Sequence, residues 1–368
     1  MLTDRKATTI EKRRDTRAMH RRHHARGVPF DVLIALIFSV GSGNLARAVE
    51  MSGLAKMVGD IRHRNVKRSA VYCSAVVVGY SVSILLSATL GEMAHGSYFW
   101  LAYGAAIVFI GTRLRGIRNI VHECAHYAFA ETRAANDAFG HALSVLTLSS
   151  FVAYRREHLS HHRSLGSYEL DLDFARLKHF DFHEELTFRR LLRHILLPLT
   201  LVNVPTYVSV TLVHPEDPRL VNAARYSYAV LLGVFAVVSP YFFCYYALVP
   251  FLIVHPALNY WTDCVDHGGI LKARGALDQS RNFILPRLLR WIFFPRNDHW
   301  HLIHHLMPFV AVRHFEDAHQ LLLAHYPGYA NLRHHVRDKV AWLIGERRSR
   351  TELQTAAPSP GNYAKGEE

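Results

Sequence analysis

Histidines occur in three short clusters whose spacing suits metal coordination: His122-Glu-Cys-Ala-His126, His158-Leu-Ser-His161-His162 and His301-Leu-Ile-His304-His305. Residues three and four apart share one face of a helix, so each cluster directs its imidazoles to one place. Imidazole is the commonest metal ligand among the side chains. The clusters therefore predict metal coordination by His122, His126, His158, His161, His162, His301, His304 and His305.

The chain has 26 histidines in 368 residues, so an HxxxH pair is expected by chance roughly once or twice, and an HxxHH triplet about a tenth of a time. Two triplets in one chain are therefore the specific signal. Eight imidazoles exceed the four ligands of a zinc site, and also the two histidines and one carboxylate of a single non-haem iron. They fit two metals that share a site, and a pair of nitrogen-rich sites favours iron and dioxygen chemistry over zinc.

Long uncharged segments are the elements that must position these clusters, and half of the chain is hydrophobic. A bilayer is crossed by about 20 apolar residues, and soluble helices seldom stay uncharged for so long. Residues 226–262 are too long for one upright span and suit a hairpin of two. The sequence predicts four transmembrane helices in two hairpins, near residues 69–90, 98–113, 226–243 and 245–262.

The segment Ile195–Val213 is ambiguous, because it is apolar but contains Pro198 and Pro205. It could cross the membrane, or it could lie along the interface as an amphipathic helix. The clusters before and after it must meet on one membrane face, so an even number of crossings must separate them. We favour the hairpin at 226–262, with Ile195–Val213 lying flat.

Polar tails at residues 1–28 and 346–368 are expected to be disordered, and they flank a membrane domain at 29–345. The first tail is basic and contributes to a net charge of +13, but no nucleic-acid-binding motif accompanies it. Residues 113–193 are rich in Arg and Lys, whereas the connector 91–97 has neither. The predicted fold is an all-α, multi-pass integral membrane protein. The positive-inside rule predicts that its termini, and a helical cap that holds the dimetal site, face the cytoplasm.

The order HxxxH, HxxHH and HxxHH resembles the three histidine boxes of the membrane fatty-acid desaturase and hydroxylase family. Residues 161–174, HHRSLGSYELDLDF, are similar to the second box and its acidic continuation, and residues 297–308, NDHWHLIHHLMP, are similar to the third. The resemblance covers about residues 69–308. It implies two iron ions with dioxygen as co-substrate, and a ninth ligand after the last span, which falls on His267 in NYWTDCVDHGG.

Asp263 departs from the family pattern, since some members have an asparagine four residues ahead of that ninth histidine. It could bind a metal, orient a ligand or only accept a hydrogen bond. Ligand imidazoles also need acceptors for their second N–H group. The candidate carboxylates are Glu123, Asp137, Asp171, Asp173, Asp266 and Asp298.

The remaining histidines match no cluster. His299 is expected at the surface or beside a ligand. The others are expected to be structural: His95, His141, His179, His183, His194, His214 and His255.

The resemblance implies a dioxygen-dependent desaturase that introduces a double bond into an acyl-lipid chain or another hydrophobic substrate. A separate ferredoxin, or a cytochrome with its reductase, would supply the electrons. Desaturation of a small amino-acid-derived metabolite, of the rhizobitoxine type, and hydroxylation on the same scaffold are the alternatives. A metal transporter would place its ligands inside the spans, where only His255 lies. A zinc hydrolase with Glu123 as its base would leave nine histidines unexplained.

Overall fold

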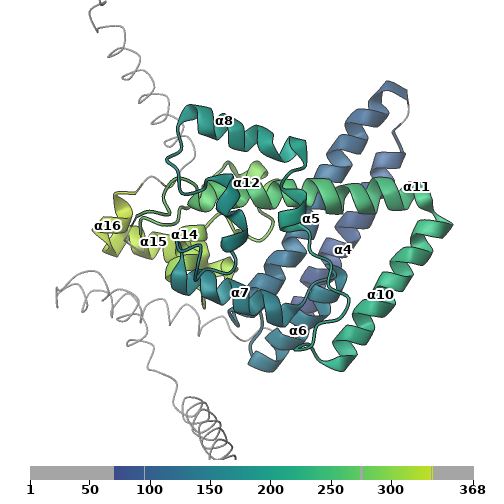
Figure 1. The fold of residues 1–368 in the computed structure, drawn as a ribbon, viewed down its shortest axis with the longest axis horizontal. Coiled ribbons are helices and arrows are strands. Elements are labelled where there is room, and N and C mark those ends of the chain that lie inside the picture. Colours follow the sequence, from purple (N-terminus) through teal and green to yellow (C-terminus); the bar gives the residue numbers. More distant parts are fainter. Residues whose placement is uncertain (1–69, 95, 274–276, 333, 335–368) are drawn as a thin grey trace, which may run out of the picture. The chain divides into compact units, whose positions relative to one another are not determined.

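The computed structural model describes residues 70–94, 96–273, 277–332 and 334. Within these ranges the chain is helical, without a β-strand (Figure 1). The all-α prediction is therefore confirmed for the described part. The predicted tails at 1–28 and 346–368, and also His95, lie outside it.

Helices α4 (Ala70–Glu92) and α5 (Phe99–Ala125) form an antiparallel pair joined by the short turn η1 (Gly96–Tyr98). Gly96 has a φ of +63°, a left-handed conformation that glycine adopts without steric cost. Four hydroxyls of α4, those of Ser81, Ser83, Ser87 and Thr89, donate to carbonyls four residues earlier. These hydroxyls are thus satisfied within the helix, as a membrane environment would require.

Helix α5 extends beyond the predicted span at 98–113, so one continuous helix connects an apolar start to the first histidine cluster. It packs closely against the helical segment around Val254. A Cβ atom at Gly111 would lie only 2.5 Å from the Val254 side chain. Glycine is therefore required at this crossing, because any larger residue would push the two helices apart.

The second hairpin turns at Ser239, between α10 (Arg219–Val238) and α11 (Pro240–Phe242). A residue that precedes proline is disfavoured in helical conformation, which explains why the break falls here and not between 243 and 245. From α11 the helix continues through η4 (Phe243–Leu248) and η5 (Pro250–Val254) into α12 (His255–His267). The η4 and η5 segments are π-helical, a widened form that accommodates Pro250.

Among the described residues, three helices are long and apolar enough to cross a membrane: Ser74–Glu92, Arg219–Val238 and Pro240–His267. Helix α5, the predicted second span, is not one of them. Its second half carries Arg113 and Arg115, which lower its hydropathy.

The segment Ile195–Val213 forms neither a span nor one interfacial helix. It consists of the end of α8 (Phe188–Leu196), then η3 (Leu197–Thr200), α9 (Val204–Tyr207) and a non-helical stretch. Pro198 and Pro205 each lie at the start of a short helix, where a missing N–H group is tolerated. The prolines thus divide the segment into short pieces.

Helix α6 (Arg133–Leu146) and helix α7 (Phe151–Ser164) begin at Thr132 and Ser150, whose hydroxyls cap them by accepting from backbone N–H groups. Apolar residues of α5, including Ile120 and Cys124, pack on Phe151 in a buried cluster. The last helices are η2 (Ala175–Phe180), α13 (Arg287–Phe293), α14 (His301–Leu306), η6 (Val312–His314), α15 (Phe315–His325) and α16 (Pro327–Ala330). Helices α14, α15 and α16 lie near α12, whereas α6 packs against α5 and α10 (Figure 1).

Candidate metal centre

Four helices bring the nine predicted histidines together. In each of two groups, one potential ligand atom per residue lies within 4.8 Å of the others. The five-histidine group consists of His122, His126, His158, His162 and His304. The four-histidine group consists of His161, His267, His301 and His305.

Each of the two HxxHH clusters contributes two histidines to one group and one histidine to the other, and the group that receives two differs between the clusters. In α7, the i and i+4 residues His158 and His162 join the five-histidine group, while His161 turns to the other. In α14, the i and i+4 residues His301 and His305 join the four-histidine group, while His304 turns to the five-histidine group. Since residues four apart share a helix face, one short helix can serve two adjacent centres in this way.

Ring nitrogens converge at the centre of each group. The Nε2 atoms of His122 and His304 are 2.8 Å apart, and those of His267 and His301 are 2.7 Å apart. The Nε2 atom of His126 is buried and has no hydrogen-bond partner among the described residues. Such clustered nitrogen lone pairs, including an unsatisfied buried one, fit the ligand set of metal ions.

Burial keeps most of these rings neutral. It lowers the pKa of His122 to about 4, and it lowers the pKa values of His158 and His304 well below the usual range. His161 differs: burial would lower its pKa, but the hydrogen bond and charge of Asp171 raise it. Metal binding requires neutral imidazole, so the histidines with a lowered pKa can bind a metal without first releasing a proton.

Hydrogen-bond acceptors on Nδ1 fix several ring orientations. The Nδ1 atom of His161 donates to Asp171 Oδ2 at 2.8 Å, and that of His267 donates to a backbone carbonyl at 2.8 Å. Asp266 lies 3.3 Å from His301 Nδ1, and Asp173 lies 3.5 Å from His158 Nδ1. A bond at Nδ1 leaves Nε2 as the free lone pair that faces the centre.

Only three of the six candidate carboxylates therefore contact the histidine groups: Asp171, Asp173 and Asp266. The other three pair with arginines. Glu123 binds Arg296 through two hydrogen bonds of 2.7 and 2.6 Å, Asp137 pairs with Arg155, and Asp298 pairs with Arg115. These three stabilise contacts between elements and do not orient rings.

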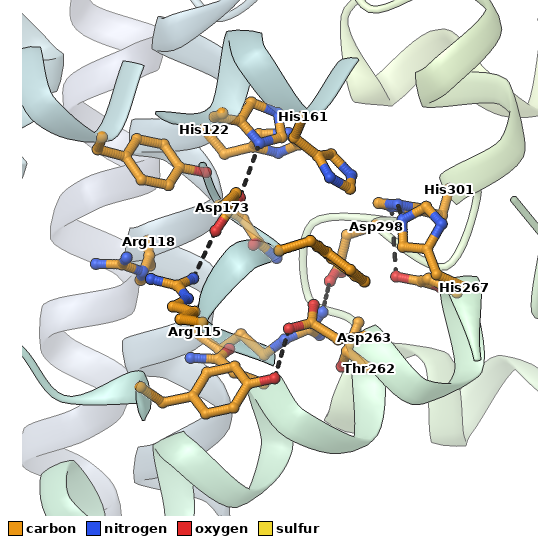
Figure 2. Close-up of a pocket in the computed structure, with 18 residues that line it drawn as sticks. Arg115, Arg118, His122, His161, Asp173, Thr262, Asp263, His267, Asp298 and His301 are labelled. Atoms are coloured by element: carbon orange, nitrogen blue, oxygen red, sulfur yellow. Dashed lines mark hydrogen bonds and ion pairs between the residues drawn. The ribbon is translucent and has the colours of Figure 1, made fainter. Parts of the chain in front are cut away.

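A cavity of about 120 Å³ opens in front of the histidines, as Figure 2 shows. Asp263 lines it from α12, where its Oδ2 atom accepts a 2.6 Å hydrogen bond from the hydroxyl of Tyr207. Of the roles open to Asp263, the structure shows hydrogen bonding, and the residue belongs to neither histidine group. Five of the nine histidines also line the cavity: His122, His158, His161, His267 and His301.

The other histidines lie apart from this centre. His299 is fully buried beside Phe294 and Trp300, so the surface expectation is wrong: the chain before α14 folds inward there. His194 bonds to the hydroxyl of Tyr260 at 2.6 Å, as befits a structural residue.

Tyr207 and Arg118 are among the cavity residues that the sequence did not predict. Arg118 could have been found, since it precedes His122 by one helical turn. Tyr207 carried no comparable signal.

The described chain is helical, with three helices long and apolar enough to span a membrane and two buried histidine groups that could each hold a metal ion, features that define a class of histidine-rich membrane proteins. Comparison with known proteins narrows this class. The family model described as fatty acid desaturase matches residues 98–337, more than half of the chain. The chain belongs to the fatty acid desaturase family, which confirms the resemblance seen in the histidine boxes.

Relatives of known activity match with low identity. The chain is 27% identical to a Δ(12)-oleate desaturase of Trichosanthes kirilowii over 31% of each protein. It is 36% identical to an oleoyl-12-hydroxylase of Ricinus communis over 21% of this chain and 19% of that protein. It thus spans less than a third of those two relatives. The dihydrorhizobitoxine desaturase of Bradyrhizobium elkanii is 22% identical over 75% of this chain and 81% of that protein.

Proposed function

We propose that the protein is a dioxygen-dependent desaturase whose two histidine groups hold two iron ions. The observation that carries this proposal is the division of the nine histidines into two adjacent groups that share helices α7 and α14. Nitrogen-rich sites beside one another suit paired redox metals better than a single zinc ion.

The iron ions, when bound, would supply the activation of dioxygen that the side chains themselves lack. For each double bond formed, the substrate loses two hydrogens and dioxygen takes up these together with two electrons and two protons, giving two waters. The electrons would come from a separate ferredoxin, or from a cytochrome with its reductase. The role of this chain is to present neutral nitrogen donors, to fix their orientation and to bury the centre away from bulk water.

Two substrate classes are in question. An acyl lipid would agree with the oleate desaturase among the relatives. A small amino-acid-derived metabolite is favoured by two observations: the longest of the reported matches is to a dihydrorhizobitoxine desaturase, and the cavity at the histidines is lined mainly by polar residues. Hydroxylation is the alternative outcome on the same centre, and analysis of the product distinguishes it.

In the membrane, we propose that α5 acts as a fourth span, so that α4 with α5 and α10 with α11–α12 form two hairpins. The histidine groups and both termini would then face the cytoplasm, where the arginine-rich residues 113–193 lie. A basic face of this kind would attract an acidic electron carrier.

Metal analysis tests the proposal directly. The purified full chain is expected to contain about two irons, and His161→Ala and His304→Ala should each lose metal, since each removes a donor from one group. His179→Ala, at an exposed histidine outside both groups, is the matched control and should keep both metals. One zinc per chain, or iron unaffected by either change, would overturn the di-iron proposal.

A further inference from the structure

Two cavities of the described chain differ sharply in chemistry. The larger, about 660 Å³, lies among α4, α5, α6, α10 and η4–η5, and apolar side chains such as Ile84, Leu114 and Leu232 line it. None of the nine histidines lines that cavity. The cavity at the histidines has arginine, aspartate, asparagine and tyrosine in its walls. The chemistry of the centre therefore faces a polar space, while the space suited to hydrocarbon lies elsewhere.

Three arginines line the polar cavity, and two of them are neutralised. Arg115 pairs with Asp298, and Arg176 pairs with Asp173 at 2.5 Å. Arg118 makes no hydrogen bond or ion pair with any residue that the structure describes. Its guanidinium lies 5.1 Å from the ring of Tyr154, an aromatic contact that leaves its N–H donors available.

A second polar group beside Arg118 also lacks a partner. Asn119 lines the same cavity, and its Nδ2 atom is buried without a hydrogen-bond partner in the described chain. A buried amide left unpaired destabilises the protein, because it has lost its hydrogen bonds to water, so such groups generally meet a ligand or water. An available guanidinium next to an unsatisfied amide donor forms a site for an anionic oxygen ligand, and the planar guanidinium fork matches a carboxylate in particular.

The dimensions favour a small ligand. The cavity volume of about 120 Å³ corresponds to about ten water-sized groups. An adjoining cavity of about 120 Å³ shares Arg118, Tyr154 and Tyr207, and serine and threonine side chains contribute to its walls. A hydrocarbon chain laid along these walls would bury their polar groups unpaired, which is unfavourable for each group.

Arg118 is also close to the reacting region. It precedes His122 by one turn of α5, which separates their Cα atoms by about 6 Å. A ligand held by Arg118 thus occupies the same small cavity as the ring of His122 and the other four lining histidines.

We propose that Arg118, aided by Asn119, binds the carboxylate of a small polar substrate and so holds the C–H bonds of that substrate in front of the histidine groups. The inference rests on the proposed function and specifies its substrate class: a carboxylic acid of about ten non-hydrogen atoms, not an acyl lipid.

Binding to the full-length, metal-loaded protein in detergent tests this inference without relying on turnover. The probes are hexanoate, norleucine and hexanol, with dioleoylphosphatidylcholine nanodiscs as the lipid comparison, and affinities are measured by calorimetry. The two carboxylates should bind, and hexanol should bind at least about tenfold more weakly, because it lacks the charged hydrogen bonds. Arg118→Gln should weaken carboxylate binding at least about tenfold, and Arg118→Lys should restore part of it.

Arg189→Gln is the matched control, because it removes the same charge from an exposed arginine that lines none of these cavities. It should bind the carboxylates as the unchanged protein does. Equal affinity for hexanol and hexanoate, unchanged binding by Arg118→Gln, failure of both carboxylates to bind, or displacement of bound hexanoate by the oleoyl lipid would each overturn the inference. Metal content measured on the same samples separates the two proposals: two irons without carboxylate binding removes only this inference, whereas absence of iron removes the di-iron proposal.

Discussion

In the four-histidine group, three of the four rings have an acceptor close to Nδ1, whereas in the five-histidine group only His158 does, among the described residues. The side-chain acceptor with the shortest distance to a ring is Asp171, which binds His161 of the four-histidine group and is fully buried. The five-histidine group is instead surrounded by ion pairs between elements. Glu123, next to His122 on α5, binds Arg296, and Arg115 on the same helix binds Asp298, shortly before α14.

The difference shows two ways to position a ligand. In one group the ring itself is oriented by a hydrogen bond, and in the other the helices that carry the rings are held together. The first mode should control metal affinity at individual residues. The second should control folding of the whole centre, because α5 and α14 must meet before His122 and His304 can lie in one group.

The largest effect is expected from removal of a ligand. His161→Ala should abolish metal binding at the four-histidine group, which then retains three donors and loses the ring that Asp171 orients. His126→Ala should leave four donors in the other group, including His304 from α14, and should therefore retain more metal than His304→Ala, which removes the only donor that α14 contributes to that group. Iron per chain after gel filtration measures all three. Equal loss in His126→Ala and His304→Ala would show that the fifth histidine is as necessary as the others.

Next in size is the ion pair of Glu123. Glu123→Gln leaves the buried guanidinium of Arg296 without its carboxylate, and such a loss typically costs about 3–5 kcal/mol of unfolding free energy. Unfolding in detergent micelles measures this change. The control is Asp181→Asn, which breaks the half-exposed pair with Arg193 and should cost about 1 kcal/mol or less. Similar losses in the two variants would argue against a special role of the α5–Arg296 contact.

A smaller effect is expected at Asp171. Asp171→Asn weakens the bond that orients His161, and loss of such an acceptor typically lowers metal affinity about 10–100-fold. Competition with a chelator measures this affinity. Asp137→Asn is the control, because Asp137 pairs with Arg155 and contacts no ligand ring. If Asp171→Asn binds metal as tightly as this control does, the orientation of the His161 ring does not depend on the carboxylate.

The smallest change is expected for Asp173→Asn. Its carboxylate lies 3.5 Å from His158 Nδ1 and also pairs with Arg176, so it holds the ring only loosely. We expect a loss of metal affinity below about tenfold, confined to the five-histidine group. The same chelator assay applies. A loss larger than that of Asp171→Asn would reverse the comparison between the groups.

The sequence predicted the helical fold and the family because both depend on local patterns. Spacings of three and four residues place imidazoles on one helix face, and the structure brings all nine predicted histidines into two groups, although their role as ligands stays a prediction. The apolar runs likewise indicated helices α4 and α10, and the prolines explain why Ile195–Val213 is divided.

What the sequence could not supply depends on contacts between distant segments. Tyr207 reaches Asp263 across 56 positions, and Glu123 reaches Arg296 across 173. No spacing rule relates such residues, because tertiary packing alone determines which carboxylate meets a ring and which meets an arginine. The sequence therefore identified six candidate carboxylates but could not predict which of them contact histidine rings and which pair with arginines.

The shared use of α14 has a consequence for the synthesis of the protein. Both groups include histidines from residues 301–305, so neither can be completed while the ribosome is still translating the chain before that point. About 180 residues separate the first histidine of the centre from the last, which takes about 10–40 s at typical elongation rates. During that interval the early histidines emerge as an incomplete set. Both groups then become complete within a few codons of each other, so the order of translation gives neither group a lead in assembling its full set of histidines.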